Sequence, residues 1–192
     1  MLKKGIIILA TLFLSSNALA QWELVNDEST VNYVSIKKSS VGELNSFKVL
    51  NGSIEDNGKV SVDIDLGSVE TNIPIRNERM KTMLFEVASF SKANISAALD
   101  SKALDKMNIG ETYKDSIRFN LSLHGLSKEM AADVRVVKLA KNRILAVSVN
   151  PIIVNADQYN LLEGVEKLRE VANLPSISTA VPVTFSLIFK QQ

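Results

Sequence analysis

The strongest constraint on the fold is an alternation of apolar and polar residues with a period of two, which recurs along most of the chain. It is clearest in Val60–Leu66, Ile117–Leu123 and Val181–Phe189. Because successive side chains of a strand point to opposite faces, each segment predicts a strand with one apolar and one polar face. Weaker alternation predicts further strands within Trp22–Ile36, Phe47–Ile54, Val87–Leu99, Met130–Leu139 and Ile144–Ile153.

Short polar links separate these predicted strands. Asp56-Asn57-Gly58-Lys59 predicts a hairpin turn, because Asn-Gly supplies the positive φ values that tight hairpins need. His124–Lys128 and Ala140–Arg143 predict two further tight links. Consecutive strands with short links form an antiparallel meander, and about eight of them favour a barrel or a sandwich. The predicted fold class is therefore all-β and antiparallel.

Two segments switch to helical spacing and predict helical insertions in this sheet. The first is 74–84, where Pro74 suits the first helical turn. The second is 157–172, with Asp157 as the expected cap and Asn173 and Pro175 ending the helix. The apolar residues expected on one side of each helix are Ile75, Met80, Met83 and Leu84 in the first, and Leu161, Val165, Leu168 and Ala172 in the second. Helices placed between strands of a meander are suited to closing one end of a barrel.

The first twenty residues have the pattern of a secretory signal peptide. Lys3 and Lys4 precede the apolar run Ile6–Leu14, and Ala18-Leu19-Ala20 forms a small-x-small cleavage signal. The apolar run is too short to span a membrane, and no second stretch of about 18 apolar residues follows. We therefore expect cleavage after Ala20 and one mature domain, 21–192, without a transmembrane segment.

Composition excludes several classes of function. The chain has no Cys and one His, which excludes thiolate metal sites, iron–sulfur clusters, disulfides and cysteine nucleophiles. Its formal charge is +1, and loss of Lys3 and Lys4 with the leader would change this to −1. With positive and negative charges nearly balanced, the chain has no excess of positive charge that would attract nucleic acid. No internal repeat or linker is present.

The candidates for acid–base chemistry are weak. His124 ends a strand before Gly125, but no Gly-x-Ser-x-Gly motif accompanies it, so a structural His or one that contacts a ligand head group is favoured over a catalytic one. Asp63 and Asp65 lie two residues apart on the polar face of a strand, where we expect both to face water.

The apolar faces of the strands point inward in a closed barrel, where about eight strands leave an interior that side chains fill or that one small ligand occupies. Trp22 is the single Trp, and Val, Ile and Leu dominate, which favours a lipophilic cavity. Arg76, Arg79 and Lys81 cluster on the first predicted helix. This cluster could bind a phosphate or carboxylate head group at the mouth of a cavity. It could equally be the solvent-exposed side of an amphipathic helix.

Several stretches, in their order and spacing, resemble the YceI-like family of polyisoprenoid-binding proteins. They are Trp22-Glu23-Leu24, Asn51-Gly52-Ser53-Ile54, Val62–Thr71, Arg76–Met80 and, as the best single match, Phe119–Lys128. The resemblance covers nearly the whole chain after the leader. It implies a lipocalin-like antiparallel barrel that holds a long isoprenoid or similar amphiphile, a bacterial periplasmic location, and no established reaction.

Together these observations predict a periplasmic carrier or sequestering protein for a polyisoprenoid, quinone or fatty amphiphile, in a tunnel of several hundred Å³. His124, Arg76 and Arg79 are the expected contacts of the head group. The expected contacts of the tail are Ile64, Leu66, Phe119, Leu121, Leu123 and Phe185. No catalytic residue, metal or cofactor is expected. The alternatives are an enzyme that uses His124 in the same cavity, and a filled barrel that binds another envelope protein.

Overall fold

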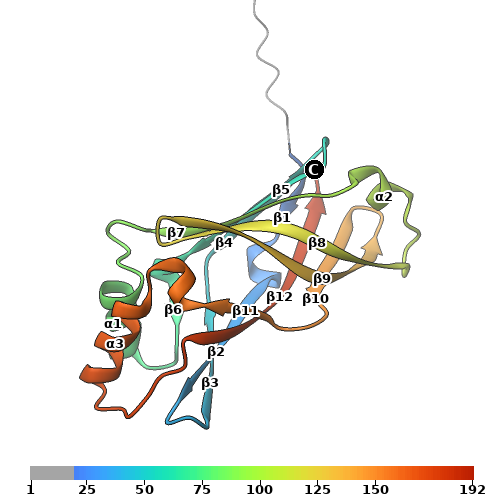
Figure 1. Ribbon diagram of the computed structural model, residues 1–192. Coiled ribbons are helices and arrows are strands. Elements are labelled where there is room, and N and C mark those ends of the chain that lie inside the picture. Colours follow the sequence, from blue (N-terminus) through green and yellow to red (C-terminus); the bar gives the residue numbers. More distant parts are fainter. Residues whose placement is uncertain (1–19) are drawn as a thin grey trace, which may run out of the picture.

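A computed structural model describes residues 20–192, which form an antiparallel barrel extended at one end by extra strands and helices (Figure 1). The predicted leader, apart from Ala20, lies outside the described residues. Twelve strands join into one sheet. Their bounds are β1 (Ala20–Leu24), β2 (Thr30–Lys37), β3 (Val41–Phe47), β4 (Leu50–Glu55), β5 (Lys59–Asp65), β6 (Val69–Glu70), β7 (Lys92–Ala98), β8 (Thr112–Leu123), β9 (Leu126–Ala140), β10 (Arg143–Ser148), β11 (Ile152–Asn155) and β12 (Ala180–Gln191).

The barrel closes because β1 pairs with β12 as well as with β4. The closed circuit is β1-β4-β5-β7-β8-β9-β10-β12, with every pairing antiparallel. This confirms the predicted all-β, lipocalin-like barrel of about eight strands. Closure leaves these strands without a free edge, which removes a template for aggregation.

The extra strands extend the sheet beyond this circuit at one end. β12 pairs with β2 and β11 through its first half and with β1 and β10 through its second half. β2 then pairs with β3, and β3 with β6. The segment predicted as one strand, 22–36, is thus two strands separated by the 3-10 turn η1 (Asn26–Glu28). Ser29 bridges the break, since its Oγ donates to the carbonyl of Val25 at 2.7 Å and accepts from the amide of Ile188 at 3.0 Å.

Helical segments cover both ends of the barrel (Figure 1). The segment predicted as the first helix is α1 (Pro74–Arg79), which continues as the π-helical turn η3 (Met80–Leu84). A short helix that we did not predict, α2 (Ser101–Lys106), lies between β7 and β8. The remaining segments are the 3-10 turns η2 (Leu66–Ser68) and η4 (Ala156–Tyr159), and the helix α3 (Leu162–Val171).

The prediction of the second helix is wrong for its first turn. Asn160 has a φ of 56°, in the left-handed region, and separates η4 from α3. Asp157 therefore does not cap the helix, which begins at Leu162. In the first helix, Ile75 is 59% exposed and does not join Met80 and Leu84 on the buried side.

Two predicted hairpins are present with different geometry. His124 and Gly125 both have positive φ, 49° and 77°, as the two-residue loop between β8 and β9 requires. In the loop between β4 and β5 only Gly58 has positive φ, at 85°, and its amide donates to the carbonyl of Glu55. Glycine thus supplies the left-handed residue of that loop, whereas Asn57 does not.

Candidate ligand-binding cavity

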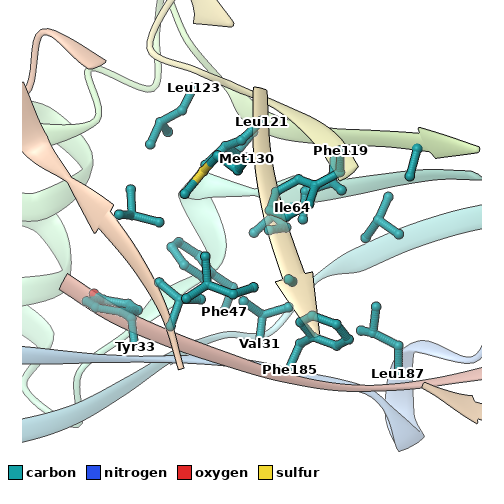
Figure 2. Close-up of a pocket in the computed structure, with 18 of the residues that line it drawn as sticks. Val31, Tyr33, Phe47, Ile64, Phe119, Leu121, Leu123, Met130, Phe185 and Leu187 are labelled. Carbon is teal, nitrogen blue, oxygen red and sulfur yellow. The ribbon is translucent and has the colours of Figure 1, made fainter. Parts of the chain in front are cut away.

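An internal cavity of about 260 Å³ runs along the inside of the barrel. All its lining residues are apolar or aromatic, and Figure 2 shows their side chains converging from strands on opposite sides of the barrel. The labelled side chains are Val31, Tyr33, Phe47, Ile64, Phe119, Leu121, Leu123, Met130, Phe185 and Leu187. The cavity is somewhat smaller than the predicted tunnel, and its presence argues against a filled barrel.

The six residues predicted to contact a ligand tail all line this cavity. They are Ile64, Leu66, Phe119, Leu121, Leu123 and Phe185. For the five that lie on strands the reason is the alternation itself, because in a closed barrel every second residue of a strand points inward. Leu66 begins the turn η2 directly after β5. β9 shows the pattern most clearly: Ala132, Val134 and Val136 are buried, while Ala131, Asp133 and Arg135 face outward or are less buried.

Small side chains help to leave the interior open. Ala93, Ala97, Ala132, Ala146 and Ala156 all lie on the cavity wall. Protein interiors are otherwise packed almost without voids, so these alanines among larger residues leave room that larger side chains would fill. We did not predict these residues. Alanine is too small to mark the apolar face of a strand by itself, and Ala146 lies between two apolar residues, Leu145 and Val147.

One end of the cavity is covered by a lid, which we define as α1, η3 and α3. Met80 and Leu84 of η3 and Val165 of α3 line the cavity, together with the flanking residues Phe85 and Leu161. α3 crosses η3 at Gly164, where a Cβ atom would lie 2.7 Å from the carbonyl oxygen of Met83 and 2.8 Å from the Cα of Leu84. Only glycine permits this approach of the two backbones.

The other end, which we call the base, lies next to α2 and the buried Trp22 of β1. Leu104 of α2 lines the cavity, and its carbonyl accepts a hydrogen bond of 3.2 Å from Nζ of Lys138. Lys138 is 4% exposed and continues the inward-facing side of β9, with its Nζ 4.6 Å from the ring centroid of the fully buried Trp22. The cation is thus held by a carbonyl and an aromatic face, with no ion pair to another described residue. Trp22 Nε1 is buried without a hydrogen-bond partner in the described chain.

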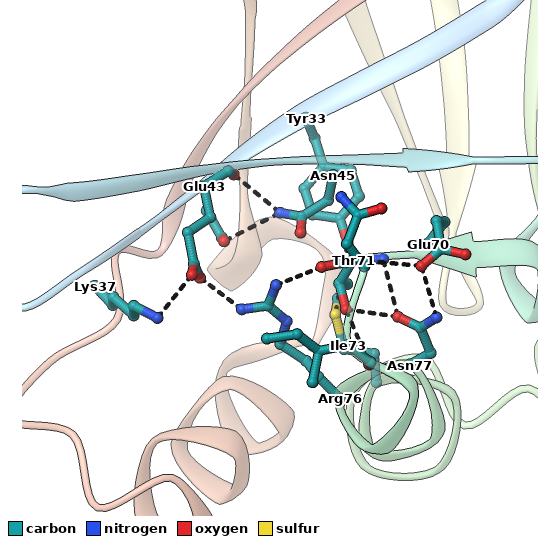
Figure 3. A network of polar contacts seen from close by, with 12 residues as sticks. Tyr33, Lys37, Glu43, Asn45, Glu70, Thr71, Ile73, Arg76 and Asn77 are labelled. Atoms are coloured by element: carbon teal, nitrogen blue, oxygen red, sulfur yellow. Dashed lines mark hydrogen bonds and ion pairs between the residues drawn. The ribbon is translucent and has the colours of Figure 1, made fainter.

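A polar network joins the lid to the β2–β3 hairpin (Figure 3). Arg76 of α1 donates from Nη1 to Glu43 of β3 at 2.6 Å and from Nη2 to the carbonyl of Thr71 at 2.6 Å. Lys37 of β2 donates to the same Glu43 carboxylate at 2.8 Å. The pKa of Glu43 is lowered chiefly by the hydrogen bond from Lys37, together with the charge of Arg76. Glu43 is therefore a carboxylate bonded by two cations.

Asn77 anchors α1 to β6 in the same network. Its Oδ1 accepts from the amide and the hydroxyl of Thr71, at 2.9 and 2.6 Å, and its Nδ2 donates to Glu70 at 3.0 Å. Glu70 also accepts from the amide of Asn72 and pairs with Lys48. These bonds, with that from Asn77 the largest, lower the pKa of Glu70 to about 2. The network holds the first turn of the lid in place.

The three residues predicted to contact a head group lie around the lid end but outside the cavity lining. Arg76 belongs to the network, and Arg79 is half-buried without a hydrogen bond or ion pair to any residue of the described chain. The ring of His124 packs at a tilt against that of Phe90, with ring centroids 4.3 Å apart, and its Nε2 lies 3.9 Å from Glu86. Both its ring nitrogens are buried without a hydrogen-bond partner in residues 20–192.

Within residues 20–192, no group of three His, Asp or Glu side chains is arranged to hold a metal ion. In the same range no helix has the length and apolar character needed to cross a membrane. Asp63 and Asp65 do not form a catalytic pair. Asp63 bonds Lys92 and Asn94 on the outside of the barrel, and Asp65 caps the turn η2 through the amide of Gly67.

The sequence matches the family model of the YceI-like domain over residues 22–189. No match was found among curated proteins. A polyisoprenoid binding domain from Saccharophagus degradans, implicated in plant cell wall breakdown, is similar in structure with a TM-score of 0.89. It is 36% identical in sequence, and the alignment covers 91% of this chain and 100% of that one.

Two more distant structures share the fold. BcnA of Burkholderia cenocepacia has a TM-score of 0.66 and 16% identity, over 86% of this chain and 98% of that one. The YCEI protein of Campylobacter jejuni has a TM-score of 0.57 and 14% identity, over 77% of this chain and 84% of that one. At these identities the likeness concerns the fold alone.

Proposed function

The chain belongs to the YceI-like domain family, and from this premise we propose that it binds a lipophilic, isoprenoid-like or quinone-like amphiphile inside the barrel. The single observation that carries the proposal is the continuous cavity lined only by apolar and aromatic side chains. Burial of a ligand tail there contributes about 0.8 kcal/mol for each CH₂ group removed from water. Ile64, Leu66, Phe119, Leu121, Leu123 and Phe185 are the proposed contacts of the tail.

The similarity to the polyisoprenoid binding domain of Saccharophagus degradans supports this ligand class. The alignment covers all of that domain, so the similarity extends over the whole barrel and is not confined to one motif. A long, flexible isoprenoid chain also suits a cavity whose wall is made of branched aliphatic and aromatic side chains, because such a wall offers contacts along its whole length.

We propose that the protein is exported to the periplasm and acts there as a carrier or sequestering protein. The support is the order of charged, apolar and small residues in 1–20, with cleavage after Ala20. The domain would then comprise residues 21–192, which agrees with the extent of the family match. Cell fractionation and N-terminal sequencing of the protein purified from its source cells test both statements.

We infer a binding role in preference to a catalytic one. His124 is the residue that the enzyme alternative would use as acid or base, and it lies beside Phe90 and Glu86, outside the cavity lining. An acid–base His acts within hydrogen-bond distance of its substrate and is oriented by a third group. Neither ring nitrogen of His124 bonds an orienting group among the described residues.

Native mass spectrometry of the protein purified from its source cells tests the proposed function. The expected result is a co-purifying amphiphile of a few hundred daltons that is lost on denaturation. Protein stripped of lipid should then bind added polyprenols or quinones with one ligand per chain. Protein that is purified without ligand and that binds neither class would contradict the proposal.

A further inference from the structure

The cavity wall changes from apolar to polar along the β2–β3 hairpin as it approaches the lid. Val31, Tyr33 and Phe47 line the cavity. Asn45 pairs with Tyr33 across the two strands, and Glu43 pairs with Ser35 two residues further along. The inward-facing side of the hairpin therefore begins to offer polar groups where the apolar lining ends (Figures 2 and 3).

Two buried polar atoms in this region lack partners. Asn45 is 3% exposed, and its Nδ2 donates to Ser35 Oγ and to the carbonyl of Glu43, both at 3.1 Å, whereas its Oδ1 accepts no bond from the described residues. Arg76 uses both terminal nitrogens, on Glu43 and on Thr71, while its Nε is buried and unpaired in the same range. Buried polar atoms are almost always hydrogen-bonded, so one free acceptor and one free donor in one network point to a ligand.

Tyr33 connects these atoms to the cavity. Its ring lines the cavity, and its hydroxyl donates to the sulfur of Met80 at 3.5 Å, a weak acceptor. Burial raises the pKa of Tyr33 well above its usual range, although the nearby charge of Arg76 opposes the shift, so the hydroxyl stays neutral and can both donate and accept. Met80 also lines the cavity, and its flexible side chain can move aside for a better partner of the hydroxyl.

The polar groups of this network indicate the charge of the ligand head group that would fit them. The two terminal nitrogens of Arg76, which form the fork that grips a phosphate or carboxylate, are occupied by Glu43 and Thr71. The free Oδ1 of Asn45 needs a donor, and an anionic head group would place only lone pairs against it. The site therefore matches a neutral group that offers one donor and one acceptor.

We propose that Tyr33, Asn45 and Arg76 bind the head group of the ligand and select an uncharged head, such as an alcohol or a phenol, over a phosphate or carboxylate. The head-group hydroxyl donates to Asn45 Oδ1, and its oxygen, which has two lone pairs, accepts from both Tyr33 and Arg76 Nε. The Tyr33 hydroxyl then no longer donates to the Met80 sulfur. This inference rests on the proposed function and names the ligand class that this end of the same cavity selects.

Titration of three probes that share one C20 isoprenoid chain tests the proposal. The probes are geranylgeraniol, its monophosphate, and the hydrocarbon that lacks the hydroxyl, each added to protein stripped of lipid. We expect the alcohol to bind about tenfold tighter than either of the other two, because only the alcohol satisfies both free atoms. Calorimetry or native mass spectrometry gives the three affinities.

Two variants and a matched control assign the preference to this site. Tyr33→Phe keeps the ring that lines the cavity, and Asn45→Leu removes the free acceptor, so each should bring the affinity of the alcohol close to that of the hydrocarbon. Should Asn45→Leu fold poorly, Tyr33→Phe still tests the site. Asn32→Leu is the control, because Asn32 precedes Tyr33 on β2 and faces the other side of the sheet, and it should leave the ratio unchanged.

The outcomes separate this inference from the proposed function. Equal affinity for all three probes, tighter binding of the phosphate, or a preference for the alcohol that survives Tyr33→Phe would overturn the head-group site and leave the barrel as a lipid-binding protein. Absence of binding for all three probes would overturn both.

Discussion

The two ends of the barrel are closed by different chemistry. At the base, Trp22 and Leu104 are buried, and the polar atoms nearby, Lys138 Nζ and Trp22 Nε1, are donors. At the lid, two helical segments cross at Gly164, and the network around Arg76 leaves both a donor and an acceptor unpaired. From this comparison we expect the base mainly to stabilise the barrel, and we propose that the lid end determines ligand specificity.

The largest expected effect is at the base. Trp22→Ala should lower the free energy of unfolding by about 3–5 kcal/mol, because it removes a fully buried aromatic side chain and the face that Lys138 covers. Denaturant unfolding measures the change. A loss below about 1 kcal/mol would mean that the base does not have the stabilising role assigned to it.

An intermediate effect is expected at the helix crossing of the lid. Gly164→Ala should cost about 1–3 kcal/mol, because its Cβ would lie 2.7 Å from the carbonyl oxygen of Met83. The displaced lid should also release bound lipid faster, which a competition experiment measures. Gly42→Ala is the control, since its Cβ would meet only Val34, at an ordinary 3.5 Å. A stabilised Gly164→Ala variant with unchanged release would show that the lid is not tightly packed at this point.

The smallest expected effect is the acid sensitivity that Glu70 contributes at the lid end. The pKa of Glu70 is lowered to about 2, from 4.5, so its contribution to stability is present above pH 4.5 and is lost as the pH falls toward 2. Glu70→Gln should therefore show a smaller decrease of Tm than the unmodified protein between pH 5 and pH 2. Glu129→Gln, on the exposed side of β9, should behave like the unmodified protein. Identical pH profiles for all three would contradict the role of the Glu70–Asn77 contact.

The barrel and the inward-facing position of the proposed tail contacts could be predicted from the sequence, because both follow from local alternation. Ile64, Phe119 and Phe185 line the cavity for the same reason that their neighbours face outward. The division of 157–172 could not be predicted, since helical spacing continues through Asn160 while its backbone turns left-handed.

The polar groups at the lid end of the cavity could not be predicted from the sequence either. Asn45 is important only because β3 places it opposite Tyr33 and because Arg76 approaches from α1, contacts between segments far apart in the chain. Arg76 was predicted as a head-group contact from its charge, and the structure places that charge against Glu43. In this network Nε of Arg76 remains as the free donor, which the spacing of residues in the sequence cannot predict.

The most direct test of the central claim, that the barrel interior holds the ligand, compares two adjacent alanines of β9. Ala132 lines the cavity, and Ala131 is exposed on the outer face. Titration of the lipid-stripped variants with geranylgeraniol should show at least a tenfold loss of affinity for Ala132→Trp, whose side chain occupies the cavity, and unchanged affinity for Ala131→Trp. Binding that is unaffected by Ala132→Trp in a folded protein would contradict the account.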